Sequence, residues 1–291
     1  SEIIFGIPFA EKYAGGNYYA NKWIANAGRA AYKFNGWAAG GSTAIPQFLD
    51  TYDKDDSRFN STWILGQQYD ANTGAPILSD GLPVSYTKEI HSIETPGCYP
   101  FEGARLVKYE ILPGDFGTSY DDVPFFRLAD AYMIKAECLL RLGGYKGETE
   151  QDAADLVTKV RARAFKNNPE KAVRTVAQLK GGSAYAYGHR ENQGIMGESD
   201  NWIITTEGGA AIELGGLLDD LAWEFVAEHH RRQDLIRFRI TGKNQNVYNG
   251  KSWFCKDANT NPTDNHCDIF PLPKDFMNGN PKLVQNPGYS K

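Results

Sequence analysis

Two amphipathic helices joined by a glycine-rich turn are predicted between residues 125 and 166, and this hairpin constrains the fold more than any other segment. The first helix places apolar side chains at spacings of three and four, which form one stripe: Leu128, Tyr132, Ala136 and Leu139. Gly143 and Gly144 follow, and they supply the left-handed backbone that ends many helices. A mainly helical fold is therefore expected.

The second helix of the pair carries the facing stripe, made of Ala153, Leu156, Val157 and Val160. Ala136 and Ala153 are small, so we expect both to be buried where the two helices approach closely. Cys138 lies on or beside the apolar face of the first helix and is expected to be a buried small hydrophobe. The pair resembles one tetratricopeptide-type hairpin, a unit that packs but carries no chemistry of its own.

Short motifs in and around the hairpin resemble those of the SusD/RagB family, whose members are surface glycan-capture lipoproteins of Bacteroidetes. Those before and inside the hairpin are DDSR at 55–58, KYE at 108–110, RLAD at 127–130, AE at 136–137, LG at 142–143 and VRARA at 160–164. Those after it are EFVAEHHRRQDLIRF at 224–238, FPLP at 270–273, NP at 280–281 and QNPGY at 285–289. Each motif is short, but together they follow the family's order across most of the chain.

The resemblance implies a mainly α fold, in which tetratricopeptide-like helical hairpins combine with long irregular loops and a few short strands. It also implies that the chain is the C-terminal portion of a longer protein whose N-terminal helical half is missing from this sequence. Residues 1–120 would then hold a loop-rich ligand-binding part, 125–240 the helical scaffold and 241–291 a coil tail.

The function implied by the resemblance is non-catalytic binding of an oligosaccharide or polysaccharide at the bacterial cell surface. The bound glycan would pass to a SusC-like TonB-dependent transporter in the outer membrane. The protein itself would be held at that membrane only through an N-terminal lipid anchor, and no cofactor is implied.

The composition and the charge of the chain argue against nucleic acid as a partner and against a membrane-spanning helix. Of the 291 residues, 41% are hydrophobic and 23% charged, as in ordinary soluble globular proteins. The net charge is −5 and there is no basic cluster, which argues against nucleic acid because that binding rests on neutralising phosphates. No apolar run approaches the roughly 20 residues that a membrane helix needs. The first residues, SEIIFGIPFA, contain neither a cationic leader region nor a lipobox cysteine.

Other elements follow from local patterns. Residues 1–10 are predicted to form a strand, 45–52 a short helix, and 60–120 irregular strands. One long helix is expected over 212–239, with a buried stripe made of Leu214, Leu218, Leu221 and Phe225. The tail from residue 241 is rich in Asn, Pro and Gly, which favours coil.

The densest charged cluster lies within the predicted long helix. Glu224, Glu228 and Arg231 recur at spacings of three and four, which places opposite charges together. His229 and His230 are adjacent and so point to different faces of a helix, unlike the H-E-x-x-H pattern of zinc enzymes. We interpret the cluster as a structural ion-pair lattice, in which Glu228, Asp234 and the neighbouring arginines are paired and hold no metal.

Two acidic segments offer metal-binding alternatives. Residues 257–268 have the spacing of a calcium loop, but Pro262 occupies the position that requires glycine, so a solvated turn is the better interpretation. The acidic residues at 50–56 are interpreted as helix-end and turn residues, with an ion pair to Arg58. Cys255 and Cys267 bracket a polar loop, and they are either a local disulfide or two thiols.

The candidate ligand site is a loop-rich segment near the N-terminus. It contains Trp37 among glycines, together with Tyr32, Asn35, Tyr18 and Tyr19. Aromatic faces stack on the C–H-rich faces of pyranose rings, and amide side chains satisfy sugar hydroxyls. We expect these residues to line a shallow exposed site for a neutral oligosaccharide. The alternative is that Trp37 fills a gap beneath the loop, because large aromatic side chains are mostly buried.

Two other function classes stay open at this point. A glycoside hydrolase needs two carboxylates that flank a sugar, and none of the 36 acidic residues lies in a recognisable catalytic motif. A helical-repeat module that binds peptides would use the hairpin itself, although one hairpin is too few for a repeat array.

Overall fold

The computed structural model describes residues 2–10, 12–14, 16, 18, 22–90, 101–114, 120–187, 189–192, 203–206, 212–238 and 266–290. The helices are η1 (Asn26–Tyr32), α2 (Pro46–Leu49), α3 (Ser57–Thr62), α4 (Leu128–Leu142), α5 (Glu150–Arg161), η2 (Pro169–Ala172), α6 (Val176–Lys180), α7 (Gly215–Glu224), α8 (Arg231–Arg237), η4 (His266–Asp268) and α9 (Lys274–Gly279). The strands are β1 (Ile3–Ile7), β2 (Trp63–Ile64), β3 (Gly66–Gln67), β4 (Leu78–Ser79), β5 (Leu82–Pro83), β6 (Ser85–Tyr86), β7 (Arg105–Leu106), β8 (Val123–Arg127), β9 (His189–Asn192) and β10 (Ile203–Thr206). The expected mainly α fold with a few short strands is confirmed.

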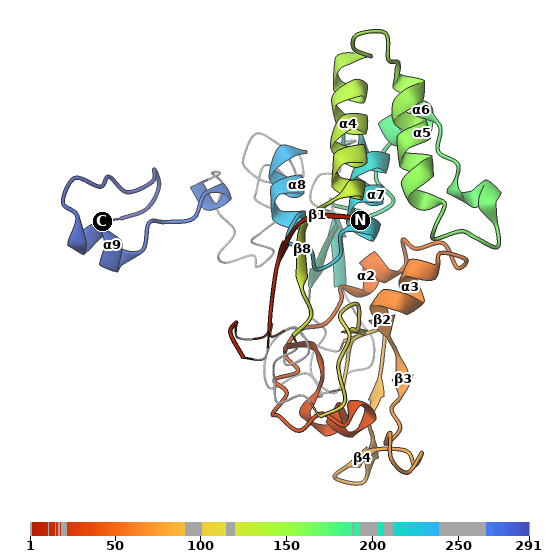
Figure 1. Cartoon of the computed structure of the whole chain (residues 1–291), viewed down its shortest axis with the longest axis vertical. Coiled ribbons are helices and arrows are strands. Elements are labelled where there is room, and N and C mark those ends of the chain that lie inside the picture. The colour runs from red at the N-terminus through yellow and green to blue at the C-terminus, as the bar shows by residue number, and fades with distance from the viewer. Residues whose placement is uncertain are drawn as a thin grey trace.

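The predicted hairpin is formed by α4 and α5, which stand side by side at the top of Figure 1. The first turn of α4 is capped because the Asp130 carboxylate accepts the Arg127 backbone N–H at 2.9 Å. Gly143 ends α4 in the left-handed conformation, with φ of 70°. Thr149 and Asp152 form a reciprocal capping box at the start of α5. Each end of the hairpin is thus set by its local sequence.

Helix packing confirms the close contact but shifts the predicted stripe of α4. Ala136 and Ala153 are fully buried, as predicted. Leu128 is 41% exposed, however, and the buried stripe instead contains Ala129, Met133, Ala136 and Leu140. Position 138 is two residues from 136 and therefore lies on the opposite side of the helix. The prediction that Cys138 is buried is wrong for this reason, since its side chain is exposed.

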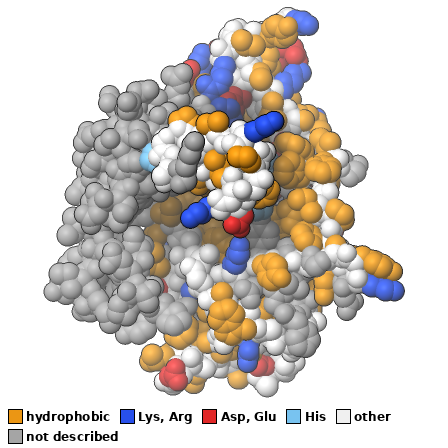
Figure 2. Space-filling model, turned by 90° about the vertical axis from the view of Figure 1, so that its left-hand side faces the viewer, with side chains coloured by type: hydrophobic (Ala, Val, Ile, Leu, Met, Phe, Trp, Pro, Cys, Tyr) orange, Lys and Arg blue, Asp and Glu red, His pale blue; other side chains and the backbone are white. Residues whose placement is uncertain are grey.

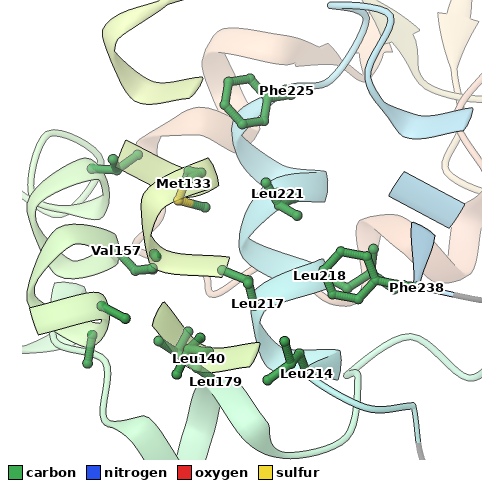
Figure 3. Close-up of a cluster of buried hydrophobic side chains, with 14 of the residues drawn as sticks. Met133, Leu140, Val157, Leu179, Leu214, Leu217, Leu218, Leu221, Phe225 and Phe238 are labelled. Atoms are coloured by element: carbon green, nitrogen blue, oxygen red, sulfur yellow. The ribbon is translucent and has the colours of Figure 1, made fainter. Parts of the chain in front are cut away.

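The main core lies between the hairpin and the elements that follow it. Figure 3 shows side chains of α4 and α5 facing those of α6, α7 and the end of α8. The four residues of the predicted stripe Leu214, Leu218, Leu221 and Phe225 are all buried in this core. The helices of the scaffold are therefore fixed mainly by burial of aliphatic surface.

The predicted long helix over 212–239 is wrong, because the chain turns between α7 and α8. Ala227 and His229 adopt left-handed backbone conformations, with φ of 59° and 66°. The Lys108 ammonium group donates to the carbonyl oxygens of Glu224 and Val226, at 3.2 and 3.0 Å. These carbonyl groups are satisfied by a side chain from elsewhere in the chain, so the helix can end there without leaving them unpaired.

The described strands pair two by two as short antiparallel ribbons. The longest ribbon joins β1 to β8 and so confirms the strand predicted at residues 1–10. Apolar side chains stand exposed along it, namely Ile3, Ile4, Phe5, Ile7, Phe125 and Phe126. Figure 2 shows hydrophobic side chains gathered along the right-hand side of the face that it draws.

Two further features complete the fold. Helix α2 confirms the short helix predicted at 45–52, whereas α9 lies within the segment predicted to be coil. None of the helices that the structure describes is long and apolar enough to span a lipid bilayer.

Candidate functional site

The loop that carries Trp37 begins where η1 ends. Lys33 closes η1 in the left-handed conformation, with φ of 53°. Beyond it, Phe34 and Ala38 are only 3% and 1% exposed and anchor the loop in a small apolar cluster. Asn35 is exposed between these anchors, and Trp37 is 66% exposed. The loop therefore turns its two anchors inward and presents an amide and an indole at the surface.

The far end of the loop is also held by the backbone. Ala39 forms an antiparallel bridge with Ala25, and the Ala38 N–H donates to the Asn26 side-chain oxygen at 3.3 Å. Gly40 has φ of 64°, and a Cβ at this position would lie 2.8 Å from the Cα of Ala25. Only glycine fits there, because any side chain would collide with the backbone.

A buried arginine ties this loop to the strands beneath it. Arg105, which is 1% exposed, donates to the carbonyl oxygens of Gly40, Ser42 and Glu102, the last at 2.9 Å. Its guanidinium group also lies over the Tyr86 ring, 5.1 Å from the centroid. The loop is thus an anchored platform, an arrangement that displays a binding residue without a large ordering cost.

The charged residues that stood out in the sequence lie elsewhere, in a buried network that joins distant parts of the chain. Arg58 pairs with Asp56 at 2.6 Å and with Glu224 at 3.2 Å. Arg127 pairs with Glu224 and with Glu228, each at 2.7 Å. Burial alone raises the pKa of Glu224, but the neighbouring arginine charges outweigh it and hold that pKa below its usual range.

Further ion pairs extend this network. Lys108 pairs with Glu228, and Arg163 with Glu224. A second group joins Arg237 to Glu137 and Asp234 at 2.9 and 2.8 Å. The prediction of a structural lattice at 224–238 is confirmed, although its members are brought together by a turn and by other elements rather than by one helix.

The remaining acidic and histidine candidates are also accounted for. Asp56 caps α3 and pairs with Arg58, as predicted, while Asp53 and Asp55 pair with Lys171. His230 lies 3.2 Å from Asp130. Across the part of the chain that the structure describes, no group of His, Cys, Asp or Glu residues is arranged to hold a metal ion. The calcium-like spacing at 257–265, Cys255 and the Cys267 side chain lie outside the described residues.

The residues of this network are the ones that carry the sequence motifs, and the comparison with family sequence models agrees. The sequence model of the SusD family matches residues 1–289. The chain belongs to the SusD family. Its conspicuous charged motifs therefore hold the fold together, and a candidate ligand site is sought among other residues.

Individual relatives give the scale of the similarity. The chain is 27% identical over 194 residues to the starch-binding protein SusD of Bacteroides thetaiotaomicron, an alignment that covers 65% of this chain and 26% of that protein. It is 30% identical over 161 residues to a SusD-like protein of Formosa agariphila, with 55% and 23% covered. The surface glycan-binding protein A of Bacteroides thetaiotaomicron has a similar fold, with a TM-score of 0.55, 15% identity and coverage of 98% and 52%. The chain thus spans about a quarter of the curated relatives and about half of that solved chain.

The sequence-predicted site residues of this SusD-family chain fall into two groups. Trp37 and Tyr18 are 66% and 61% exposed, so Trp37 does not fill a gap beneath the loop. Asn35 donates through its amide nitrogen to the Gly114 carbonyl at 3.2 Å, and among the described residues its amide oxygen has no protein donor. Tyr32 instead packs half-buried against the apolar anchors, and burial raises the pKa of its hydroxyl. Tyr19 lies outside the described residues.

Sequence reasoning missed a cavity of about 390 Å³ between the loop region and the scaffold helices. Its aromatic lining is drawn from five separate segments: Trp23, Phe48, Trp63, Tyr185, Tyr187 and Phe225. The pairing of Tyr185 with Tyr187 was the one local signal for it. Thr43, His229, Arg231 and Asp234 also line this space, but most of its surface is apolar. Most hydroxyl groups of a sugar would therefore be left there without partners. The exposed loop suits a glycan better.

Proposed function

We propose that this SusD-family chain binds an oligosaccharide or polysaccharide at the bacterial cell surface and breaks no bond in it. The bound glycan is passed to a SusC-like TonB-dependent transporter in the outer membrane. The names of the relatives, a starch-binding protein and a surface glycan-binding protein, support the class of ligand. The observation that carries the proposal is the exposed indole of Trp37 on a loop that is anchored at both ends.

The chemistry of the loop fits capture of a sugar. The indole face stacks on a pyranose ring. The amide oxygen of Asn35, which has no protein donor among the described residues, accepts a hydrogen bond from a hydroxyl group. Tyr18 extends the aromatic surface, while Tyr32 supports the loop from below. Tyr19, outside the described residues, stays a candidate on the sequence alone. A site this open binds each sugar weakly, and repeated contacts along a polymer raise the total affinity.

The loop lacks what hydrolysis would need. Glycoside hydrolysis uses two carboxyl groups on either side of the scissile bond, and residues 22–41 contain no Asp or Glu. The buried carboxylates of the network are paired with arginines and do not line this surface. Binding without catalysis is therefore the better proposal for this chain.

Affinity electrophoresis in gels that contain a panel of nutrient polysaccharides tests the proposal. Retardation by at least one polysaccharide is expected, and Trp37→Ala should abolish it while leaving the melting temperature nearly unchanged. Tyr145→Ala is the matched control, because Tyr145 is a similarly exposed aromatic residue in the turn between α4 and α5. Release of new reducing ends would favour a hydrolase, and binding in a peptide screen without glycan binding would favour a peptide module. If Trp37→Ala and Tyr145→Ala lost retardation equally, the assignment of Trp37 to the glycan site would be wrong.

A further inference from the structure

The segment that comprises η1, the residues before it and the platform loop differs in charge from the chain as a whole. Residues 22–41 contain three basic residues and no acidic residue, although the whole chain has a net charge of −5. The three are Lys22, Arg29 and Lys33, and all are exposed. Arg29 lies within η1, Lys33 directly follows η1, and Lys22 lies shortly before it.

The positions of these cations follow from the backbone contacts of the loop. Arg29 lies in η1 and donates through its guanidinium group to the Gly36 carbonyl at 3.4 Å, directly before Trp37. Lys33 closes η1, two residues before Asn35. At the other end of the loop, the Lys22 carbonyl accepts the backbone N–H of Ser42 at 3.2 Å. The cations therefore flank the platform at both ends.

These three cations form no ion pair with a carboxylate among the described residues, unlike four lysines in other parts of the chain. Lys88, Lys135, Lys171 and Lys180 are each paired with an Asp or Glu. Asp70 is close enough for its carboxylate to feel the charge of Lys33, but its oxygen accepts the backbone N–H groups of Asn72 and Thr73 at 2.8 and 2.9 Å. Of the N–H groups of Arg29, only one has a protein acceptor in the described part of the chain. Within the described part of the chain, η1 and the platform loop therefore offer positive charge that is not taken up in an ion pair with a carboxylate.

We propose that the Trp37 platform binds an acidic glycan, a polymer that bears uronate carboxylates or sulfate groups. This inference rests on the proposed function and replaces the expected neutral ligand with a charged one. Trp37 stacks on a sugar ring, while Arg29, Lys33 and Lys22 hold anionic groups on the same or neighbouring sugars. Guanidinium and ammonium groups suit this task because carboxylate and sulfate oxygens accept charge-assisted hydrogen bonds.

Pairs of oligosaccharides that differ only in their acidic groups separate the effect of ligand charge from that of the sugar rings. An oligogalacturonate is compared with the same oligosaccharide after reduction of its carboxyl groups, and a sulfated carrageenan oligosaccharide with its desulfated form. The panel of nutrient polysaccharides is tested in the same way, each in its native form and after its carboxyl groups have been reduced or its sulfate groups removed. The acidic member of a pair should bind more tightly, and added salt should weaken its binding because these charges are exposed.

Charge variants connect the effect to the named residues. Each removed cation should weaken acidic-glycan binding about two- to fivefold, and Lys22→Gln, Arg29→Gln and Lys33→Gln together about tenfold or more. The pair Lys22→Gln and Lys33→Gln leaves the Arg29 contact to the loop intact and guards against a misfolded platform. The matched control is Lys54→Gln, Lys166→Gln and Lys274→Gln, which removes the same charge from exposed sites elsewhere and should leave binding unchanged.

Each outcome of these binding measurements either supports or overturns the inference that the site takes an acidic glycan. Preference for the acidic member, with loss in the loop variants only, supports the inference, and the pair that shows it identifies carboxylate or sulfate. Equal or tighter binding of the neutral members overturns it and leaves glycan capture standing. Equal loss in the loop and control variants also overturns it, since only net charge would then matter. Failure to bind any member of the panel overturns both this inference and the proposed function.

Discussion

Asp219 is a buried carboxyl in the scaffold that has no close cation partner of its own in the described network. It accepts hydrogen bonds from the Ser183 hydroxyl and from the Ala184 backbone N–H, the latter at 2.6 Å. Burial nevertheless raises the pKa of Asp219 to about 6, from an ordinary value of 3.8. The native state therefore holds this proton more tightly than the unfolded chain does.

This raised pKa predicts a pH dependence that Asp219→Asn removes. Between about pH 4 and 6 the native state binds more protons at this site, so its contribution to the free energy of unfolding falls as pH rises. Between these pH values the free energy of unfolding falls by about 3 kcal/mol at most, because the pKa of Asp219 differs by about two units between the native and unfolded states and each unit corresponds to roughly 1.4 kcal/mol. Urea unfolding at pH 4 and pH 7 should show the wild type losing stability relative to Asp219→Asn, whereas Asp155→Asn, at an exposed site on α5, serves as control. A constant difference between wild type and Asp219→Asn would contradict a raised pKa at this residue.

At the scale of elements, the hairpin of α4 and α5 was the most predictable part of the fold. Its caps, its turn glycines and its period of apolar residues are all local features of the sequence. The break between α7 and α8 was not predictable in the same way. It depends on Lys108, which lies more than 100 residues earlier in the chain and satisfies the carbonyl groups where α7 ends. A periodic pattern cannot reveal such a partner.

Ala136→Trp tests the packing of the hairpin. Ala136 is fully buried against α5, so a bulky ring would force the helices apart and cost about 1–3 kcal/mol or more. The measurement is the free energy of unfolding in urea. Cys138→Ala changes an exposed position on the same helix and should stay within about 0.5 kcal/mol of the wild type. A tolerated tryptophan would mean that α4 and α5 are not in close contact.

At the scale of the whole molecule, an exposed loop around Trp37 could be predicted from the sequence, but its surroundings could not. Trp37, Asn35 and Tyr18 stand out because aromatic, amide and glycine residues share one segment. The aromatic cavity was missed because its walls come from segments as far apart as Trp23 and Phe225. The basic character of residues 22–41 can be read from the sequence, but the contact of Arg29 with the Gly36 carbonyl, next to Trp37, depends on the folded loop.

Arg127→Met tests the network that unites these parts. The substitution leaves Glu224 and Glu228 with fewer cations in a buried place, and we expect a loss of about 3–5 kcal/mol in the free energy of unfolding. Arg141→Met removes a more exposed pair with Glu137 and should cost no more than about 1 kcal/mol. Glycan retardation by folded Arg127→Met protein should match the wild type. A stable variant that lost glycan binding would instead assign Arg127 to the ligand site.

The same network has a consequence for the order in which the chain folds. Its members are contributed by positions as distant as Arg58 and Glu224, and the ribbon of β1 and β8 closes across more than 100 residues. The chain loses conformational entropy when such long loops close, and it does so before the contacts stabilise the closed form. Folding is therefore slowed, and we expect the network and the ribbon to form together late in folding. Until α7 emerges during synthesis, Arg58 and Arg127 lack the Glu224 carboxylate that they share. The part of the chain made before α7 is therefore not expected to reach its stable folded structure by itself. Folding of this molecule is therefore expected to wait for α7 rather than to proceed from one end.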